Sequence, residues 1–221
     1  MENNLTPAQQ AFKIIKEARA IVLSTVDKNG NPAARGVNCL GIDEDKQYIY
    51  FFIPSHKSVV KQIMANNNVA ITTGMIERPE FYVRVHGVAE VIDESIKEEF
   101  IKRQPWFGEF FAKGCGIKNM VPFAVKKGHG EIFSMGVLDN NMETFGRLRF
   151  AFGGDEVVPV GHVIDKETCV GCKACMKVCP TATISFNEET NACQIYDNKC
   201  IECGICNETC PVDAISDGIG L

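Results

Sequence analysis

The sequence predicts a chain of two unlike parts: a mainly β part that forms a small barrel with a helix over one end, followed by a small cysteine-rich module. Three observations support this division. Short apolar segments separated by turn residues fill the first 139 of the 221 residues, with few helical patterns among them. Nine of the 11 cysteines lie between Cys169 and Cys210. The net charge is +1 up to Asp139 and −6 from Asn140 onward, an asymmetry typical of a composite chain.

The composition excludes several classes of protein. Apolar residues make up 45% of the chain and charged residues 23%, as in ordinary globular proteins, so the chain is not disordered as a whole. Its longest apolar stretch, Tyr48 to Pro54, has the length of a strand and is too short for a membrane span. The net charge of −5 argues against binding of nucleic acid by phosphate neutralisation. The first ten residues lack the features of a signal peptide, so we expect a cytoplasmic protein with reduced thiols.

Capping, turn and periodicity signals predict the elements of the first part. Thr6 and Gln9 form a capping box and Pro7 occupies the first helical position, so a helix is predicted at about 7–19. The strand predicted at 47–53 is apolar on both faces and should be buried on both. The other predicted elements are strands at about 20–26, 33–42, 69–74 and 81–92, helices at 57–66 and 94–103, and a hairpin whose turn, 127–130, joins 122–126 to 131–135.

The cysteine-rich tail contains a duplicated motif. Residues 169–180 read CVGCKACMKVCP and residues 200–211 read CIECGICNETCP, so the pattern C-x2-C-x2-C-x3-C-P recurs after 31 residues. Three thiolates at this spacing can surround one face of a metal cluster, and the fourth, followed by proline, reaches the partner cluster. The expected ligands are Cys169, Cys172, Cys175 and Cys210 for the first cluster, and Cys200, Cys203, Cys206 and Cys179 for the second.

Other interpretations of the cysteines agree less well with the pattern. A zinc site would use two CxxC pairs set well apart, and disulfides conflict with a reducing compartment. Over about residues 160–221 the tail resembles bacterial-type ferredoxins, which implies an α+β fold with two [4Fe–4S] clusters. Cys193 lies outside both runs and is expected to be a small buried hydrophobe. Cys39 is expected in the core and Cys115 in an exposed loop.

The first part also resembles a known family. The segments AIVLSTVDKNGNPAARGV, YIYFFI, PSHKSVVKQIMANNNVAI and FYVRVHGVAEVID follow one another as in the pyridoxamine 5′-phosphate oxidase-like split-barrel proteins, over about residues 6–136. The resemblance implies a Greek-key split β-barrel with flanking helices, a homodimer, and FMN bound at the dimer interface. The expected domains are 1–139 for the FMN-binding barrel, 140–160 for a connector and 161–221 for the ferredoxin domain. Residues 147–152 alternate in strand fashion, so the connector should pack on one of the domains.

A phosphate site is expected where the buried strand meets the helix that follows it. The amides and dipole of a helix N-terminus favour an anion, and serine hydroxyls and lysine ammonium groups add to this. The resemblance also implies a basic residue that contacts the flavin on the second predicted strand, at the position of Arg35. The candidate flavin contacts are Arg35, Gly36, Val37, Ser55, His56, Lys57, Ser58 and Lys61.

Simpler roles for several of these residues stay open. Ser55 would then only cap the helix, His56 would be a polar loop residue, and Arg35 would be an exposed strand residue. Arg84 is expected at the barrel surface or in a dimer contact. The aromatic residues of 105–111 could cover a flavin, although packing in the core or in a dimer is the favoured role.

The two resemblances together predict an electron-transfer function. Pyridoxamine phosphate oxidases end in a substrate strand that bears tryptophan, arginine and histidine, and nothing after Met135 resembles it. We therefore expect an oxidoreductase in which FMN exchanges electrons with an unknown substrate or donor and two [4Fe–4S] clusters pass them to or from a redox partner. No catalytic acid, base or nucleophile is predicted. The alternatives are a non-enzymatic electron carrier, a redox sensor, and a barrel that binds another ligand such as haem or a deazaflavin.

Overall fold

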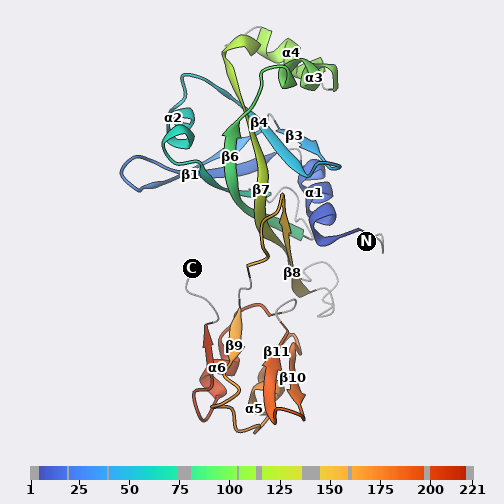
Figure 1. Cartoon of the computed structure of the whole chain (residues 1–221), viewed down its shortest axis with the longest axis vertical. Coiled ribbons are helices and arrows are strands. Elements are labelled where there is room, and N and C mark those ends of the chain that lie inside the picture. The colour runs from blue at the N-terminus through green and yellow to red at the C-terminus, as the bar shows by residue number, and fades with distance from the viewer. Residues whose placement is uncertain are drawn as a thin grey trace. The chain divides into compact units, whose positions relative to one another are not determined.

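The strands and helices come from a computed structural model that describes residues 5–18, 20–38, 40–73, 81–103, 105–112, 116–135, 145–158, 161–196 and 200–217 (Figure 1). The strands are β1 (Ile21–Val26), β2 (Pro32–Val37), β3 (Leu40–Asp43), β4 (Tyr48–Pro54), β5 (Asn68–Thr73), β6 (Phe81–Val91), β7 (Met120–Met135), β8 (Phe145–Phe152), β9 (His162–Ile164), β10 (Ile184–Asn187), β11 (Ala192–Ile195) and β12 (Ile215–Asp217). The helices are α1 (Pro7–Ala18), α2 (Ser58–Ala65), α3 (Ile96–Arg103), α4 (Pro105–Ala112), the 3₁₀ helix η1 (Ile117–Asn119), α5 (Ala174–Val178) and α6 (Ile205–Thr209).

Two units share the chain, and the chain passes between them more than once. The first unit comprises Met1–Glu131 and Phe150–Glu156, and the second comprises Ile132–Arg149 and Val157–Leu221. Both units therefore contain residues of β8, which pairs with β7 and confirms the strand predicted within the connector. The domain boundaries expected from the sequence stay a prediction.

Most of one antiparallel half-barrel sheet lies in the first unit, and the sheet is of the predicted kind. The strand order is β2-β1-β5-β6-β7-β4-β3, with β8 beside β7. Helix α1 starts at the predicted capping box: the Thr6 N–H donates to Gln9 Oε1 at 2.8 Å, and the Gln9 N–H donates to Thr6 Oγ1 at 3.3 Å. The helix buries Phe12 and Ile15. None of the helices in the described part of the chain combines the length and apolar character that crossing a membrane requires.

Strand β4 is buried on both faces, as its apolar sequence predicts. On one face Phe51 stacks on Phe123 with ring centroids 5.4 Å apart. On the other, Phe52 packs with Phe100 of α3 and Phe107 of α4. Phe107 is fully buried, so the favoured core role is confirmed for this member of the aromatic segment. The side chains of Phe110 and Phe111 lie outside the described residues.

The single strand expected at 33–42 is instead two strands. Strand β2 ends at Val37 and pairs with β1, whereas β3 starts at Leu40 and pairs with β4. The chain changes partner between them, and a continuous run of strand residues does not show such a change. Cys39 and Cys115 lie outside the described residues.

The predicted hairpin at 127–130 is wrong, because β7 runs unbroken from Met120 to Met135. The glycines there serve close contact between strands. A Cβ on Gly128 would lie 2.3 Å from the carbonyl oxygen of His86, and a Cβ on Gly130 would lie 2.1 Å from that of Arg84. Glycine clusters typically mark turns, but glycine within a strand also marks a close approach of another backbone. Only the neighbouring strand distinguishes the two cases.

The second unit keeps the duplication of its sequence in its backbone. Strand β9 pairs with β12, and β10 pairs with β11. Helices α5 and α6 each contain the third cysteine of a run. Three pairs of positions 31 residues apart share positive φ angles, namely Gly171 and Glu202, Lys173 and Gly204, and Ala182 and Asp213.

Replacing Gly128 by alanine is expected to lower the free energy of unfolding by about 1–3 kcal/mol, the usual cost of overpacking, because the clashing atom is a backbone oxygen that cannot rotate away. Urea denaturation measures the change. Gly36→Ala is the control, since a Cβ there meets no atom within 4 Å. Equal stability of the two variants would contradict the close approach of β6 and β7.

Candidate functional site

The two cysteine runs line two cavities in the second unit. The first cavity is lined by Cys169, Cys172, Cys175 and Cys210, and the second by Cys179, Cys200, Cys203 and Cys206. Each cavity thus brings together three thiols of one run and the last thiol of the other, which is the grouping expected from the sequence. All nine cysteines of the described residues are free thiols.

The thiols of each group surround a cavity and do not converge on a single point. Within the described residues no three ligating side chains converge as one metal ion would require. Burial raises the pKa of the Cys175 thiol to about 12 and also raises the pKa of the Cys206 thiol. Apolar surroundings disfavour a thiolate until a positive partner compensates it. The cavities therefore suit a bulky, positively charged group such as the iron of a cluster.

Backbone amides and a ninth thiol complete the first cavity. The Cys193 N–H donates to Cys169 Sγ at 3.5 Å, and the Ala214 N–H donates to Cys210 Sγ at 3.3 Å. Such bonds tune the potential of a bound cluster. Cys193 is 1% exposed and packs with Ile184, so the expectation of a small buried hydrophobe is confirmed.

The residues expected to bind phosphate lie together between β4 and α2. Ser55, His56, Lys57, Ser58 and Lys61 are all exposed. Lys57 occupies the N-cap position, and its side chain makes no capping bond. The simpler role of Ser55 as the helix cap is therefore wrong, because Lys57 and not Ser55 holds the N-cap position. The Ser55 N–H donates to the Asn119 carbonyl oxygen at 2.8 Å.

Arg35 is half-buried and connects β2 to α2. Its Nη1 donates to Thr25 Oγ1 at 2.7 Å and to the Leu23 carbonyl oxygen at 3.2 Å, and its Nη2 donates to Gln62 Oε1 at 2.9 Å. Burial lowers the pKa of Arg35, yet an arginine stays charged in proteins. The positive charge is thus held at α2, the helix that begins next to Lys57.

The two neighbours of Arg35 have different surroundings. Gly36 is exposed, and a Cβ on it would meet no atom within 4 Å, so its backbone is open to a ligand. Val37 is buried in the core, so only its backbone could contact a flavin.

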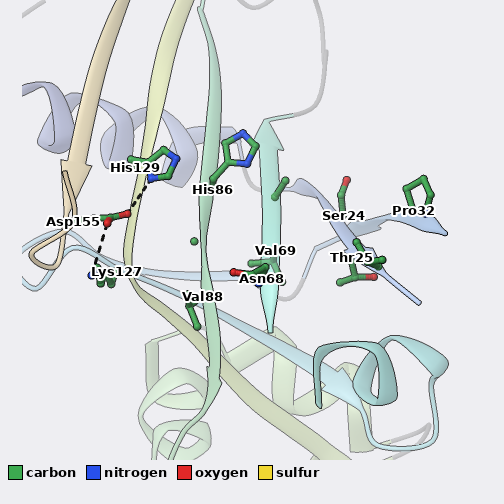
Figure 2. Close-up of a pocket in the computed structure, with 13 residues that line it drawn as sticks. Ser24, Thr25, Pro32, Asn68, Val69, His86, Val88, Lys127, His129 and Asp155 are labelled. Carbon is green, nitrogen blue, oxygen red and sulfur yellow. Dashed lines mark hydrogen bonds and ion pairs between the residues drawn. The ribbon is translucent and has the colours of Figure 1, made fainter. Parts of the chain in front are cut away.

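The first unit also has a cavity that the sequence did not predict. Its volume is about 580 Å³, and it lies over β1, β5, β6 and β7 (Figure 2). Thr25 lines it and bonds to Arg35, so the cavity and the expected flavin contacts share one residue. The lining residues are Ser24, Thr25, Val26, Pro32, Asn68, Val69, Ala70, His86, Gly87, Val88, Lys127, His129 and Asp155.

Four of these residues form a polar group (Figure 2). His129 Nδ1 lies 2.9 Å from Asp155 Oδ2, Lys127 Nζ lies 3.7 Å from Asp155 Oδ1, and the rings of His86 and His129 stack 5.7 Å apart. The His129 hydrogen bond lowers the pKa of Asp155. In the tautomer that carries its proton on Nδ1, His129 donates to the Asp155 carboxylate, and its Nε2 is left to contact a ligand.

Sequence reasoning missed this group for two reasons. His129 fell in the predicted turn, and Asp155 fell in the connector. Arg84, by contrast, lies at the surface as expected, and its Nη1 pairs with Glu131 Oε1 at 2.8 Å. The alternation of Arg84 and His86 was the available signal that His86 shares this face.

Comparison with known proteins agrees with the two parts of the chain. The family model for pyridoxamine 5′-phosphate oxidase matches residues 5–118, and the model for a 4Fe-4S dicluster domain matches residues 162–211. No curated protein matched the sequence.

Solved structures show the same fold for the first part. A NimC/NimA family protein from Clostridium acetobutylicum is 19% identical with a TM-score of 0.52, covering 66% of this chain and 92% of that chain. A heme binding protein from Mycobacterium smegmatis is 11% identical with a TM-score of 0.50, covering 67% of this chain and 59% of that chain. At these identities the likeness concerns the fold alone.

The pKa of His86 should respond in opposite directions to two substitutions on β7. Burial, followed by repulsion from His129, lowers this pKa from its ordinary value of 6.5, whereas Glu131 raises it. His129→Gln should therefore raise the pKa of His86, and Glu131→Gln should lower it, as followed by NMR titration of the imidazole resonances.

The direction of the His86 pKa shift also predicts how the stability of the protein depends on pH. Because the pKa of His86 is lower in the folded protein, its contribution to the free energy of unfolding is present above about pH 6.5 and is lost as the pH falls. For the two substitutions on β7, shifts of the His86 pKa in the same direction would contradict the arrangement of His86, His129 and Glu131 on β6 and β7.

Proposed function

The chain belongs to the pyridoxamine 5′-phosphate oxidase family, and on this premise we propose that it is an iron–sulfur flavoprotein that passes electrons between FMN in the first unit and two [4Fe–4S] clusters in the second. The observation that carries the proposal is the grouping of four thiols around each cavity of the second unit. A ferredoxin-type module attached to a barrel of this family supports electron transfer. It gives no support to oxidation of a B6 vitamer.

The residues of the second unit fit the proposed clusters. Cys169, Cys172, Cys175 and Cys210 would hold one cluster, and Cys179, Cys200, Cys203 and Cys206 the other. A bound [4Fe–4S] cluster supplies the exchange of single electrons. The chain supplies the thiolates, the backbone N–H groups near sulfur and an apolar enclosure that includes Ile184 and Ile215.

The residues between β4 and α2 fit the phosphate of FMN. Lys57 and Lys61 supply positive charge, and Ser55 and Ser58 supply hydroxyl donors, all on exposed side chains at the start of a helix. Arg35 brings a further charge to α2. A bound flavin supplies the exchange of one or two electrons.

The cavity over β6 and β7 is the place we propose for the reacting ligand. A two-electron change of an organic molecule is accompanied by proton exchange, whereas clusters exchange electrons alone. His129, whose ring the Asp155 carboxylate would orient, would exchange a proton with the ligand there. The substrate class, the physiological redox partner and the homodimer remain parts of this proposal.

Haem in place of FMN is the second candidate ligand, because one structure of the same fold is described as a heme binding protein. An absorption spectrum of the anaerobically purified protein separates the two. Flavin bands near one per chain together with broad iron–sulfur absorbance support the proposal. A sharp haem band, or no flavin even after incubation with FMN, contradicts it. Bleaching of the flavin by a substrate would distinguish an enzyme from a carrier or sensor.

Lys57→Ala should weaken FMN retention and leave the iron content unchanged, because the substitution removes a charge from the proposed phosphate site only. Fluorescence of released flavin per chain measures the loss. Lys28→Ala removes an equally exposed lysine in the turn after β1 and serves as the control. Equal flavin occupancy in the two variants would remove the phosphate assignment.

Cys179→Ala should damage the cluster held by the second run more than the cluster held by the first, because Cys179 lines the second cavity. Iron analysis with electron paramagnetic resonance measures both clusters. Cys193→Ala, which changes a thiol of the first cavity outside the expected ligands, should leave iron content intact. Selective loss of the first cluster in Cys179→Ala would contradict the assignment of Cys179 to the cluster of the second run.

A further inference from the structure

The first cavity of the second unit has one thiol more than a cluster uses. Five thiols line it, namely those of Cys169, Cys172, Cys175, Cys193 and Cys210, whereas the thiols that line the second cavity are those of the four expected ligands. The fifth thiol belongs to Cys193, which lies on β11, outside both cysteine runs. It therefore has the chemistry of an iron ligand and no place in the expected set of four.

Cys193 contacts two of the expected ligands of the first cluster. Its N–H donates to Cys169 Sγ at 3.5 Å. Its side chain packs in one cluster with that of Cys175, and the two thiols lie within hydrogen-bonding reach of each other, since burial and then this contact raise the pKa of Cys175. Cys193 is 1% exposed. Its sulfur atom is thus enclosed in the cavity beside that of Cys175.

The internal repeat identifies the equivalent positions at the second cavity. The residue 31 positions after Cys175 is Cys206, and the residue 31 positions before Cys193 is His162, which lies on β9 and lines the second cavity. The His162 side chain is 8% exposed. Both repeats therefore bury a side chain at this place, but a thiol, the usual ligand of an iron–sulfur cluster, stands there in the first cavity only.

The two cavities consequently differ in what remains when one ligand is lost. Without Cys175, four thiols still line the first cavity, because Cys193 remains. Without the equivalent Cys206, three thiols line the second. A [4Fe–4S] cluster is held by four thiolates, so the first cavity alone retains a full set.

We propose that Cys193 is a reserve ligand of the first cluster and binds iron in place of Cys175 when the bond from Cys175 to iron is broken. The inference rests on the proposed clusters. In the exchange, the bond from Cys175 Sγ to iron breaks and a bond from Cys193 Sγ to the same iron forms. The Cys193 thiol gives its proton to the departing Cys175 thiolate. No electron is gained or lost, so the exchange needs neither an oxidant nor a reductant.

The test compares Cys175→Ala with its matched control Cys206→Ala, both as full-length protein purified anaerobically, by iron analysis and electron paramagnetic resonance. Cys175→Ala should keep both clusters, with a changed spectrum of the first, because one ligand now comes from β11. Cys206→Ala should lose the second cluster, and with it about half of the iron. Cys175→Ala combined with Cys193→Ala should lose the first cluster, whereas Cys193→Ala alone should keep both.

A transplanted thiol tests the same inference at the second cavity. His162→Cys places a thiol at the equivalent position, so its addition to Cys206→Ala should restore the second cluster. This combination decides the inference if thermal unfolding shows that Cys175→Ala has lost its fold: restored iron supports the inference, and unrestored iron overturns it.

Three results in folded variants would overturn the inference. These are loss of the first cluster alone in Cys175→Ala, its conversion there to a [3Fe–4S] cluster, and equal iron content of Cys175→Ala with and without Cys193→Ala. A wild-type protein with fewer than two clusters would overturn the proposed function itself. A wild-type protein with both clusters, of which Cys175→Ala loses the first, would overturn the reserve role only, so the two failures are distinguishable.

Discussion

The second unit depends on the crossed grouping of thiols, in which each cavity takes its fourth thiol from the other cysteine run. Each cavity takes three thiols from one run and the fourth from the other, so neither repeat can complete a cavity alone. A segment of this size buries little apolar surface, and its core is built from the thiols themselves together with a few aliphatic residues such as Ile184 and Ile215. Burial raises the pKa of the Cys175 and Cys206 thiols, so thiolates in these cavities need a positively charged group beside them.

In the first unit, the arrangement of the polar cavity depends on close contact between strands. Gly128 and Gly130 let β7 approach β6 more closely than a Cβ would permit. Gly153, with φ of 63°, turns the chain after β8 against the carbonyl oxygen of Lys126 and so brings Asp155 to His129. The polar face of the cavity therefore consists of side chains placed by glycines, and an inserted methyl group would separate the strands that carry it.

The two units would handle electrons under different physical conditions. The cavity of the first unit has a volume of about 580 Å³, and its lining includes His86, His129, Lys127 and Asp155. The cavities of the second unit are lined mainly by thiols and apolar residues, with Lys173 at the first and Glu202 and His162 at the second. Within the second unit, Arg147 of β8 pairs with Glu202 of the second cysteine run at 2.7 Å.

The sequence alone determined the features that depend on local spacing. The capping box of Thr6 and Gln9 and the doubly apolar strand β4 follow from residues near one another in the chain. The grouping of the eight cysteines follows from the spacing within each run and from the duplication of that run. Only the tertiary structure decided that 127–130 lies within a strand, that Arg35 reaches Gln62, and that Asp155 joins His129. These features depend on which strands become neighbours, because glycine has the same local signature in a turn and in a close contact, and a charged side chain does not indicate its partner.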